Sequence, residues 1–492
     1  MRTRVISIAD RSNNMLTRIT DNRKERGTVI PGVRIADAQF PAPFRSGLEY
    51  SSPARGTWNI VHTGMLIPGA HEIYVCAAGC LRGVVLTAAE MGTMDRFSTV
   101  AIREHNLLDG DMEELVIEGV SDIIGKLPKR PPAVLVYTSC VHHFTGVDLD
   151  MIYARLRERF PDIDFADCYM NPIMRKSGLT PDQLMRSRLY MLLHERPLDP
   201  AAAAIIGNDL PAQEDSDLMR LLTAAGLRIH EITSCRTYEE YQEMAESSVY
   251  ISYNPDAAAG GDMLEERLGG KHHYLKFSFD RSEIDEEFRK LADTLLASCK
   301  TFGTEDKSAA EAEMAALLET IRTEGRAASD EELRKTRDLI GDTPVAIDYT
   351  FCPRPLGLAR LLLDNGFNVV RVYADGIPGA DRPDFDYLQE HYPELMLHPT
   401  VHASMRFANS ENRSAAEDAS TDGSRVRVLA VGQKAAYFEN TEHFVNVVEG
   451  GGMTGYEAIT RTLKLIRDAY LNVKPMRDLV QIKGLGCEVC VR

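Results

Sequence analysis

The sequence lacks any continuous apolar run of about 18 residues, so no membrane-spanning helix is expected. Its opening segment, MRTRVISIADRSNNMLTRIT, has basic residues but no apolar core of the kind found in secretory signals, and a cytoplasmic location is the default expectation. Positive charge is also scarce, because 56 lysines and arginines stand against 73 acidic residues, for a formal net charge of −17. This deficit argues against nucleic acid and anionic membrane as the main partners.

Two common nucleotide-binding or catalytic motifs are absent as well. No G-x-x-x-x-G-K-[ST] occurs, since the nearest segment, GGKHH at 269–273, lacks both the spacing and the hydroxyl. No G-x-S-x-G is present, and the G-x-G-x-x-G at 450–455 is not expected to mark a dinucleotide site of the usual kind. We therefore expect no nucleotide site of the usual kinds in this chain.

Composition and periodicity indicate a globular α/β protein. The 492 residues include 44% hydrophobic and 26% charged residues, and the length predicts about three domains. From about residue 58, short apolar runs alternate with patterns in which apolar residues recur three and four positions apart. The expected strands are 131–140, 201–209, 226–232, 247–254, 272–279, 343–350, 368–374 and 425–432. The expected helices are 150–160, 216–226, 237–247, 260–269, 280–298, 304–340, 355–367, 384–394 and 455–472. Repeated β–α units predict three Rossmann-like lobes, each a mostly parallel sheet flanked by helices.

The predicted organisation has an N-terminal arm at 1–57, a first lobe at 58–195, a second at 196–335, and a third with the C-terminal tail at 336–492. The arm is rich in Arg, Pro, Gly and Asn, which is typical either of a flexible tail or of a segment that wraps a partner subunit. Residues 408–424 are polar and of low complexity, and are expected to form a loop. Sheets of this kind bind ligands beyond the carboxyl ends of their strands, so motifs at strand ends carry most weight.

Cysteine is the residue whose number needs an explanation. Nine cysteines stand at positions 76, 80, 140, 168, 235, 299, 352, 487 and 490. The number is odd, and a disulfide framework is unexpected in a long chain with an expected cytoplasmic location. Metal binding, redox chemistry and simple burial remain as interpretations.

The segment HEIYVCAAGCLRGVVL (71–86) places Cys76 and Cys80 four residues apart with only small residues between them. Small residues let the backbone approach a bulky inorganic centre, and Gly79 can take conformations that turn the Cys80 sulfur outward. Two buried structural cysteines would give the same pattern, so this segment alone does not decide between a metal site and burial.

The segment VLVYTSCVHHFTGVDLD (134–150) places Cys140 at the end of a buried strand, where parallel sheets hold ligands. His142 and His143 follow it, and zinc is one interpretation of such a Cys/His group. The alternative is a structural role for Cys140 and a packing or surface role for the two histidines.

Taken together and in order, the two segments resemble the alpha and beta chains of nitrogenase component 1 and their relatives. The matching features are AAGCLRG at 77–83 and the T-x-C-x₅-G-x-D-L element within 134–150. Further similar segments are 97–123, 201–229, 351–370 and 448–466, so that the resemblance spans most of residues 58–470. Relatives in this family include cofactor-assembly scaffolds and the reductases of protochlorophyllide, chlorophyllide and nickel-sirohydrochlorin.

The resemblance implies an oxidoreductase subunit of three Rossmann-type lobes. It also implies an iron–sulfur cluster, 4Fe-4S or larger, shared at the interface with an identical or homologous subunit in a dimer or tetramer. A separate ATP-hydrolysing iron protein would be the electron donor. The expected function is that of a nitrogenase-like two-component reductase, which passes electrons through the cluster to an unidentified substrate or cofactor.

The resemblance also assigns residues to the cluster. Cys80 and Cys140 fall on ligand positions of the family, and thiolate ligation of iron suits such cysteines. The family has a further ligand upstream of the first of these, but the corresponding segment SPARGTWNI (52–60) contains no cysteine. Either Cys76 or the partner subunit is expected to supply it.

A second departure concerns the large cofactor. The nitrogenase alpha chain holds its iron–molybdenum cofactor through a Cys in the second lobe and a His in the third. The corresponding places here are near 249–258, which offers Tyr253 and Asn254, and near 446–452, with no His closer than His443. Dinitrogen reduction is therefore disfavoured, and a non-catalytic scaffold or carrier for metallocluster assembly is the alternative function.

Other cysteines and histidines have separate interpretations. Cys168 and Cys299 are expected in the core, because free cysteine packs as a small hydrophobe. Cys235, at a strand–helix junction, is left open between a structural and a functional role. The histidine pairs at 142–143 and 272–273 are candidate proton donors near a reducing centre, with packing as the alternative.

The last three cysteines lie in the third lobe and its tail. Cys352 stands beside Arg354, whose charge is a candidate for favouring a thiolate or binding an anionic substrate, and its role is left open between these and a structural one. Cys487 and Cys490 form a C-x-x-C pair, for which metal binding, a redox disulfide and an incidental pairing are all open.

Overall fold

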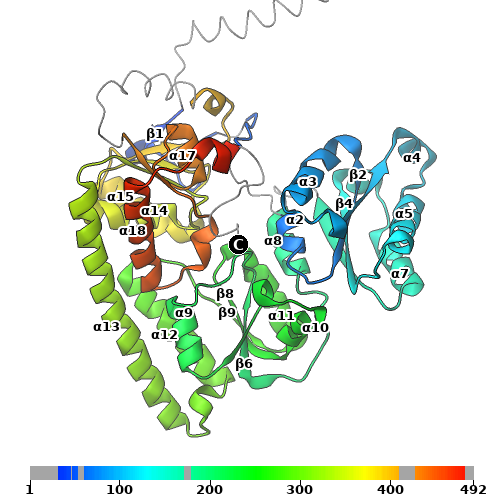
Figure 1. The fold of residues 1–492 in the computed structure, drawn as a ribbon, viewed down its shortest axis with the longest axis horizontal. Coiled ribbons are helices and arrows are strands. Elements are labelled where there is room, and N and C mark those ends of the chain that lie inside the picture. The colour runs from blue at the N-terminus through cyan, green and yellow to red at the C-terminus, as the bar shows by residue number, and fades with distance from the viewer. Residues whose placement is uncertain (1–30, 46, 54–59, 171–178, 409–426, 482–492) are drawn as a thin grey trace, which may run out of the picture.

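The computed structural model describes residues 31–45, 47–53, 60–170, 179–408 and 427–481. These residues form three sheets, with strand orders β3-β2-β4-β5, β7-β6-β8-β9 and β1-β12-β11-β10-β13-β14. Figure 1 shows the lobe built on the first sheet set to one side of the other two lobes. The predicted fold class, several mostly parallel sheets flanked by helices, is confirmed. None of the helices in the described ranges is long and apolar enough to cross a membrane.

The first sheet is parallel throughout. Its strands are β2 (His71–Ala77), β3 (Phe97–Ile102), β4 (Ala133–Ser139) and β5 (Asp164–Met170). The helices around it are α2 (Ile60–Gly64), α3 (Ala78–Glu90), α4 (Glu104–Asp109), α5 (Met112–Lys126), α6 (Cys140–Thr145), α7 (Leu149–Arg159) and α8 (Pro181–Arg188). Every residue of β4 is buried. A strand buried on both faces needs a helical layer on each, which is why β4 reads as one continuous apolar run.

The second sheet lies between the other two lobes and contributes to both of their cores. Its strands are β6 (Asp199–Ile206), β7 (Arg228–Glu231), β8 (Ser247–Ser252) and β9 (Lys271–Tyr274). Its helices are α9 (Asp217–Ala224), α10 (Tyr238–Glu243), α11 (Ala258–Leu268), α12 (Arg281–Ser298) and α13 (Lys307–Ile340). On β6, Ala203 and Ile205 join a core shared with the third lobe, whereas Ala204 and Ile206 join one shared with the first. The alternation of side chains along this strand thus connects all three lobes.

The third sheet is parallel except at one edge. Its strands are β1 (Val33–Arg34), β10 (Val345–Asp348), β11 (Val369–Tyr373), β12 (Met396–His398), β13 (Leu429–Val431) and β14 (Phe444–Val445). Its helices are α14 (Pro355–Asp364), α15 (Arg382–His391), α17 (Gln433–Glu439) and α18 (Tyr456–Leu471). β1 comes from the predicted arm and pairs antiparallel with β12, with Val33 opposite Leu397. This part of the arm therefore completes a sheet of its own chain.

Some predictions fall on residues that the structure does not describe. Residues 1–30 of the predicted arm, all but residue 408 of the predicted loop at 408–424, and the pair Cys487 and Cys490 lie outside the described residues. The predicted domain boundaries stay predictions. The one at 335/336 falls inside α13, the long helix that packs against both α12 and α18.

A carboxylate of the second lobe caps a helix of the third. Asp217, at the start of α9 and 2% exposed, accepts hydrogen bonds from the backbone N–H groups of Tyr456 (2.6 Å) and Glu457 (3.3 Å) at the start of α18. Gly455 allows this approach, because its φ is +70° and a Cβ atom there would lie 2.6 Å from Asp217 Oδ2. The unpaired N–H groups of α18 are thereby satisfied across the boundary between lobes.

Arg354 is a second ionic connection between these two lobes. Arg354 is the residue before α14 and is 3% exposed. Its guanidinium donates a hydrogen bond to the backbone oxygen of Phe277 in the second lobe at 3.2 Å. It also pairs with Asp381 (3.0 Å), Asp384 (2.6 Å) and Glu283 of α12. Burial raises the pKa of Asp381 to about 6, and the charge of Arg354 opposes that rise. The guanidinium therefore offsets the cost of burying this carboxylate.

Replacing Arg354 by Met should lower the free energy of unfolding by roughly 3–5 kcal/mol, because Asp381 would keep a buried charge without its main partner. Urea unfolding and differential scanning calorimetry measure the loss. Arg382→Met is the matched control, since this arginine pairs with Asp386 on the surface and should change stability by less than about 0.5 kcal/mol. Equal losses in the two variants would contradict the structural role of Arg354.

Candidate functional site

The two cysteines expected to bind iron lie at the same edge of the first sheet. β2 and β4 are parallel neighbours, with Val75 opposite Thr138, so their carboxyl ends are adjacent. Cys80 lies in the first turn of α3, directly after β2, and Cys140 is the first residue of α6, directly after β4. Cys80 is exposed and Cys140 partly exposed. Both side chains can therefore be reached from outside the chain.

Cys76, the third expected ligand, differs from the other two. It lies on β2, is 1% exposed, and packs in the core shared by the first and second lobes. Burial raises the pKa of its thiol to about 12, and the charges of Cys80 and Cys140 act in the same direction. The three sulfurs thus lie close enough to interact electrostatically. Within the described ranges, however, no group of three or more Cys, His, Asp or Glu side chains is arranged to hold a metal ion.

Two glycines, Gly79 and Gly83, lie beside Cys80 on an exposed stretch of α3, and no close contact with the described chain requires a glycine at either position. A Cβ atom placed on Gly79 or Gly83 would meet no atom within 4 Å. A helical glycine costs roughly 1 kcal/mol relative to alanine, so these two weaken α3 without relieving any contact inside the chain. They leave room beside the Cys80 sulfur, where a bulky group or a second subunit can approach closely.

Large apolar side chains are exposed on the helices that follow the neighbouring strands. Phe144, on α6 with Cys140, is 69% exposed, and Leu108, on α4 after β3, is 85% exposed. Strands β2, β3 and β4 are parallel neighbours, so these helices begin at one edge of the sheet. Apolar exposure gathered at one edge is typical of a protein–protein contact.

The histidines after Cys140 do not form a metal site with it in the described chain. His142 is 2% exposed, and its Nδ1 accepts a hydrogen bond from the backbone N–H of Ser139 at 3.1 Å. Burial lowers the pKa of His142, so the ring stays neutral and holds the turn after β4. His272 and His273 bond to Ser252 and Thr294 respectively and are not among the described residues that line the cavity described next, which agrees with the packing alternative.

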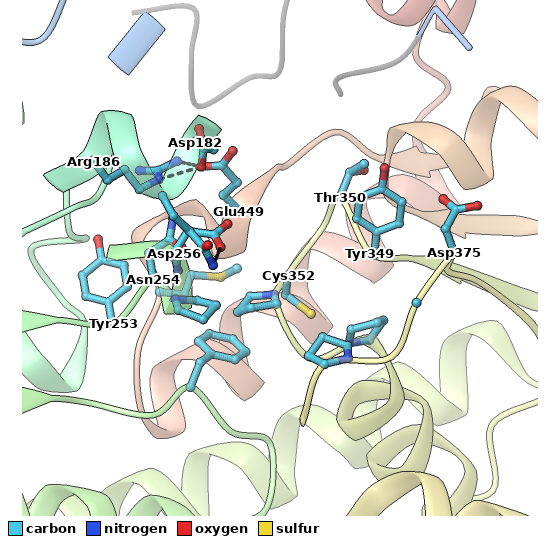
Figure 2. A pocket seen from close by; sticks show the side chains of 18 of the residues that line it. Asp182, Arg186, Tyr253, Asn254, Asp256, Tyr349, Thr350, Cys352, Asp375 and Glu449 are labelled. Atoms are coloured by element: carbon cyan, nitrogen blue, oxygen red, sulfur yellow. Dashed lines mark hydrogen bonds and ion pairs between the residues drawn. The ribbon is translucent and has the colours of Figure 1, made fainter. Parts of the chain in front are cut away.

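A second candidate site is a cavity of about 610 Å³ where the three lobes meet (Figure 2). Its walls come from α8, from the segments that follow β8, β10 and β11, and from the segment after β14. The charged residues of the lining are Glu49, Asp182, Arg186, Asp256, Asp375 and Glu449. Apolar walls are supplied by Phe277, Pro255, Pro353, Pro355, Pro378, Val401 and Met453. The cavity is thus apolar in its walls and acidic in its charge.

Arg186 is the only basic residue among the described lining residues, and it is already paired. It is 1% exposed and donates to Asp182 (2.9 Å), to Asp209 (2.9 Å) and to the backbone oxygen of Gly207 (2.5 Å). A carboxylate oxygen of Glu449 lies 3.6 Å from its Nη2. Oδ1 of Asp182 is buried without a hydrogen-bond partner in the part of the chain that the structure describes. Burial raises the pKa of Asp182, and the charge of Arg186 opposes the rise.

Cys352 lines the cavity, where burial raises the pKa of its thiol more than the nearby Arg354 lowers it. Cys352 is 1% exposed. The guanidinium of Arg354 is taken up by Asp381 and Asp384, together with Glu283, and is therefore not free to bind an anionic substrate. Cys168 is fully buried, as expected, and Cys299 is partly buried.

The segments 249–258 and 446–452, which correspond to the cofactor-ligand positions of the nitrogenase alpha chain, both contribute residues to the lining of this cavity. Tyr253 and Asn254 line it from the second lobe and Glu449 from the third, as Figure 2 shows. No histidine is among the described lining residues, and their one cysteine, Cys352, is a buried thiol. These residues do not fit a metal cofactor held by one Cys and one His.

Sequence reasoning missed the carboxylates of the cavity. Asp256 and Asp375 follow β8 and β11, so the rule that ligands bind beyond the carboxyl ends of strands could have selected them. Asp182 gave no such signal, because it lies on α8 and reaches the cavity only through the packing of the first lobe against the second.

The comparisons with known proteins agree with the fold. The family described as nitrogenase component 1 type oxidoreductase matches residues 61–420. The solved structure of nitrogenase Cp1 at pH 6.5 is 14% identical, with a TM-score of 0.60, and covers 87% of this chain and 94% of its own. The structure of nitrogenase Cp1 at pH 5 is 12% identical, with a TM-score of 0.54, over 92% and 96% of the two chains. At these identities the structural likeness concerns the fold alone. No curated protein matches the chain in sequence.

The exposure of the cysteines predicts their order of reaction. In the metal-free folded chain, iodoacetamide should alkylate Cys80 and Cys140 at least about tenfold faster than Cys168, because the last is fully buried. Peptide mapping by mass spectrometry at timed intervals measures this order. The unfolded chain in urea is the control, in which all three should react alike. Rapid reaction of Cys168 in the folded chain would contradict the structure.

Proposed function

Because the chain belongs to the nitrogenase component 1 type oxidoreductase family, we propose that it is a subunit of a two-component reductase. Electrons come from a separate ATP-hydrolysing iron protein and enter through an iron–sulfur cluster held partly by Cys80 and Cys140. The substrate binds in the cavity at the junction of the three lobes. The formal net charge of −17 favours a basic docking face on the electron donor, so the complex should weaken as salt rises.

The position of Cys80 and Cys140 is the observation that supports this proposal most. Both follow neighbouring parallel strands, and both reach the surface. Thiolates are the ligands of iron–sulfur clusters, so the donor atoms fit the proposed group. Two accessible thiols do not complete a four-ligand set, and no third ligand joins them in the described residues. A second subunit, identical or homologous, would therefore supply the remaining ligands.

The chain's own groups would have distinct tasks. Cys80 and Cys140 would hold the cluster, which supplies single-electron transfer when bound. Gly79 and Gly83 would let the cluster or the partner subunit approach α3. The apolar walls of the cavity would exclude water around the substrate, and the carboxylates would orient it.

The alternative is a scaffold or carrier that holds a metallocluster precursor without turnover. The absence of a Cys and His pair from the described lining of the cavity is compatible with it, because a carrier need only bind its cargo transiently. The two functions differ in the fate of the cavity's ligand. A reductase supplied with iron protein, ATP and dithionite returns a reduced product over many turnovers, whereas a carrier releases its ligand unchanged.

The cluster assignment predicts the effect of single cysteine variants. After anaerobic reconstitution, the chain should be brown, with absorbance near about 400 nm and bound iron. Cys80→Ala and Cys140→Ala should each lose most of the iron and the colour, because each removes one of the two accessible ligands. Iron analysis and absorbance spectroscopy measure both effects, and Cys76→Ala decides whether the buried cysteine is a third ligand.

Cys168→Ala is the matched control, because this cysteine is buried on β5 and should not affect iron binding. A chain that stays colourless and iron-free after reconstitution, both alone and together with a homologous partner subunit, would refute the cluster assignment. One zinc per chain with no visible absorbance would instead support the zinc interpretation.

A further inference from the structure

We propose that the cavity at the junction of the three lobes binds an organic cation, an amine or amidine carried on an apolar body. The inference rests on the proposed function only in treating this ligand as the substrate. It is drawn from the charge of the lining, from the hydrogen-bonding positions that the chain leaves open, and from the apolar walls between them.

The charge of the lining is the first argument. Five carboxylates and a single arginine line the cavity among the described residues. Arg186 spends its N–H groups on Asp182, Asp209 and the backbone of Gly207. An anionic ligand would meet carboxylates in a partly desolvated space and find no unpaired cation among these residues. Like charges brought together in this way cost several kcal/mol, which selects against polycarboxylates.

Open acceptor positions are the second argument. Asp182 is 7% exposed, and its Oδ1 is buried with no partner among the described residues, while its Oδ2 holds Arg186. Asp256 accepts from Gln183 through Oδ1 at 3.0 Å, and within the described ranges no donor reaches its Oδ2. Oδ2 of Asp256 can therefore accept a hydrogen bond from a ligand N–H group, whereas Oδ1 of Asp182 is enclosed by protein atoms and contributes negative charge to the lining.

Asp375 stands at the other side of the cavity, as Figure 2 shows. Its Oδ1 accepts from the backbone N–H groups of Thr400 (2.6 Å) and Val401 (2.9 Å), and its Oδ2 accepts from the Thr400 hydroxyl. A carboxylate has about four acceptor positions, so one remains on Oδ2. Lys434, a buried cation, donates to the same Thr400 hydroxyl oxygen (3.0 Å) and to Tyr349 Oη (2.5 Å). These hydrogen bonds fix Asp375 in place and leave one acceptor position on its Oδ2 for a ligand.

The walls between these carboxylates are apolar. Phe277, Pro353, Pro355 and Met453 lie in the lining, and Figure 2 places Cys352 between the group around Asp256 and the group around Asp375. A bare metal ion is a poor occupant, because the described residues offer no group of three or more ligating side chains arranged for one. An apolar body with N–H donors satisfies both the walls and the open acceptors.

Three probes with the same ring separate charge from shape: 1,4-bis(aminomethyl)benzene, 1,4-benzenedimethanol and terephthalate. Saturation-transfer NMR and calorimetric titration on the full, metal-free chain measure their binding. We expect the diamine to bind most tightly, the diol more weakly, and terephthalate not at all. Terephthalate binding as tightly as the diamine would overturn the proposal.

Variants test whether the diamine binds in the cavity. Asp256→Asn and Asp375→Asn should each weaken its binding about tenfold, because each removes one charge-assisted hydrogen bond, and should leave the diol unaffected. Asp293→Asn is the matched control, since Asp293 lies on the surface of α12 and pairs with Arg289 away from the cavity. Binding that none of the cavity variants changes would assign the diamine to the acidic surface in general and overturn the proposal.

The binding test is designed so that loss of folding or of iron binding cannot be mistaken for loss of diamine binding. Circular dichroism checks each variant, and Asp256→Asn decides the question if Asp375→Asn fails to fold, because the side-chain carbonyl that this substitution leaves can still accept from Gln183. Binding is measured without iron, electron donor or ATP. A chain that takes up no iron on reconstitution, alone or with a homologous partner subunit, but binds the diamine would refute the cluster assignment and leave this inference standing, whereas a chain that takes up iron but does not bind the diamine would do the opposite.

Discussion

The buried guanidinium of Arg186 determines where the three lobes meet. It projects from α8, the helix that packs against β5 of the first sheet and against α11 of the second lobe, and bonds to Gly207 and Asp209 just beyond the end of β6. Glu449 approaches it from the third lobe. A guanidinium removed from water must be surrounded by acceptors, and here the acceptors come from segments far apart in the chain. The arrangement of the junction and of the cavity beside it therefore depends on satisfying this one buried charge.

The same demand gives the cavity its character. More than one carboxylate lies around this buried arginine at the junction, so carboxylates outnumber the guanidinium there. Arg354 repeats the pattern on the neighbouring wall, where three carboxylates surround it. Both arginines are thus structural, and neither is free for an anionic ligand. One fold can serve different ligands, and in this chain the lining of the cavity disfavours negatively charged ones. The fold alone therefore does not identify the substrate.

The sequence predicted the fold well because buried parallel strands and amphipathic helices are local patterns. The run at 131–140 became β4, and that at 201–209 became β6, with boundaries shifted by a few residues. The same patterns placed Cys140 at the end of a strand, but only the resemblance to the family assigned Cys80 and Cys140 to a cluster. The cavity could not be predicted, because Arg186 and Glu449 are brought together only by the packing of separate lobes. The environment of Cys352 could not be predicted for a related reason: its burial, which outweighs the effect of Arg354, comes from a core that combines residues of the second and third lobes.

The edge that carries Cys80 and Cys140 has the opposite character to the junction. At the junction, the buried guanidinium groups of Arg186 and Arg354 find their partners within the chain. At the cysteine edge, two thiols have no third ligand among the described residues, two glycines leave open space, and Phe144 is exposed to water. Each of these features costs stability or solubility in an isolated chain. A contact made by another subunit over a shared cluster would account for all three at once. On the proposed function, the odd number of cysteines then needs no separate explanation, because the unit that completes the site is larger than one chain.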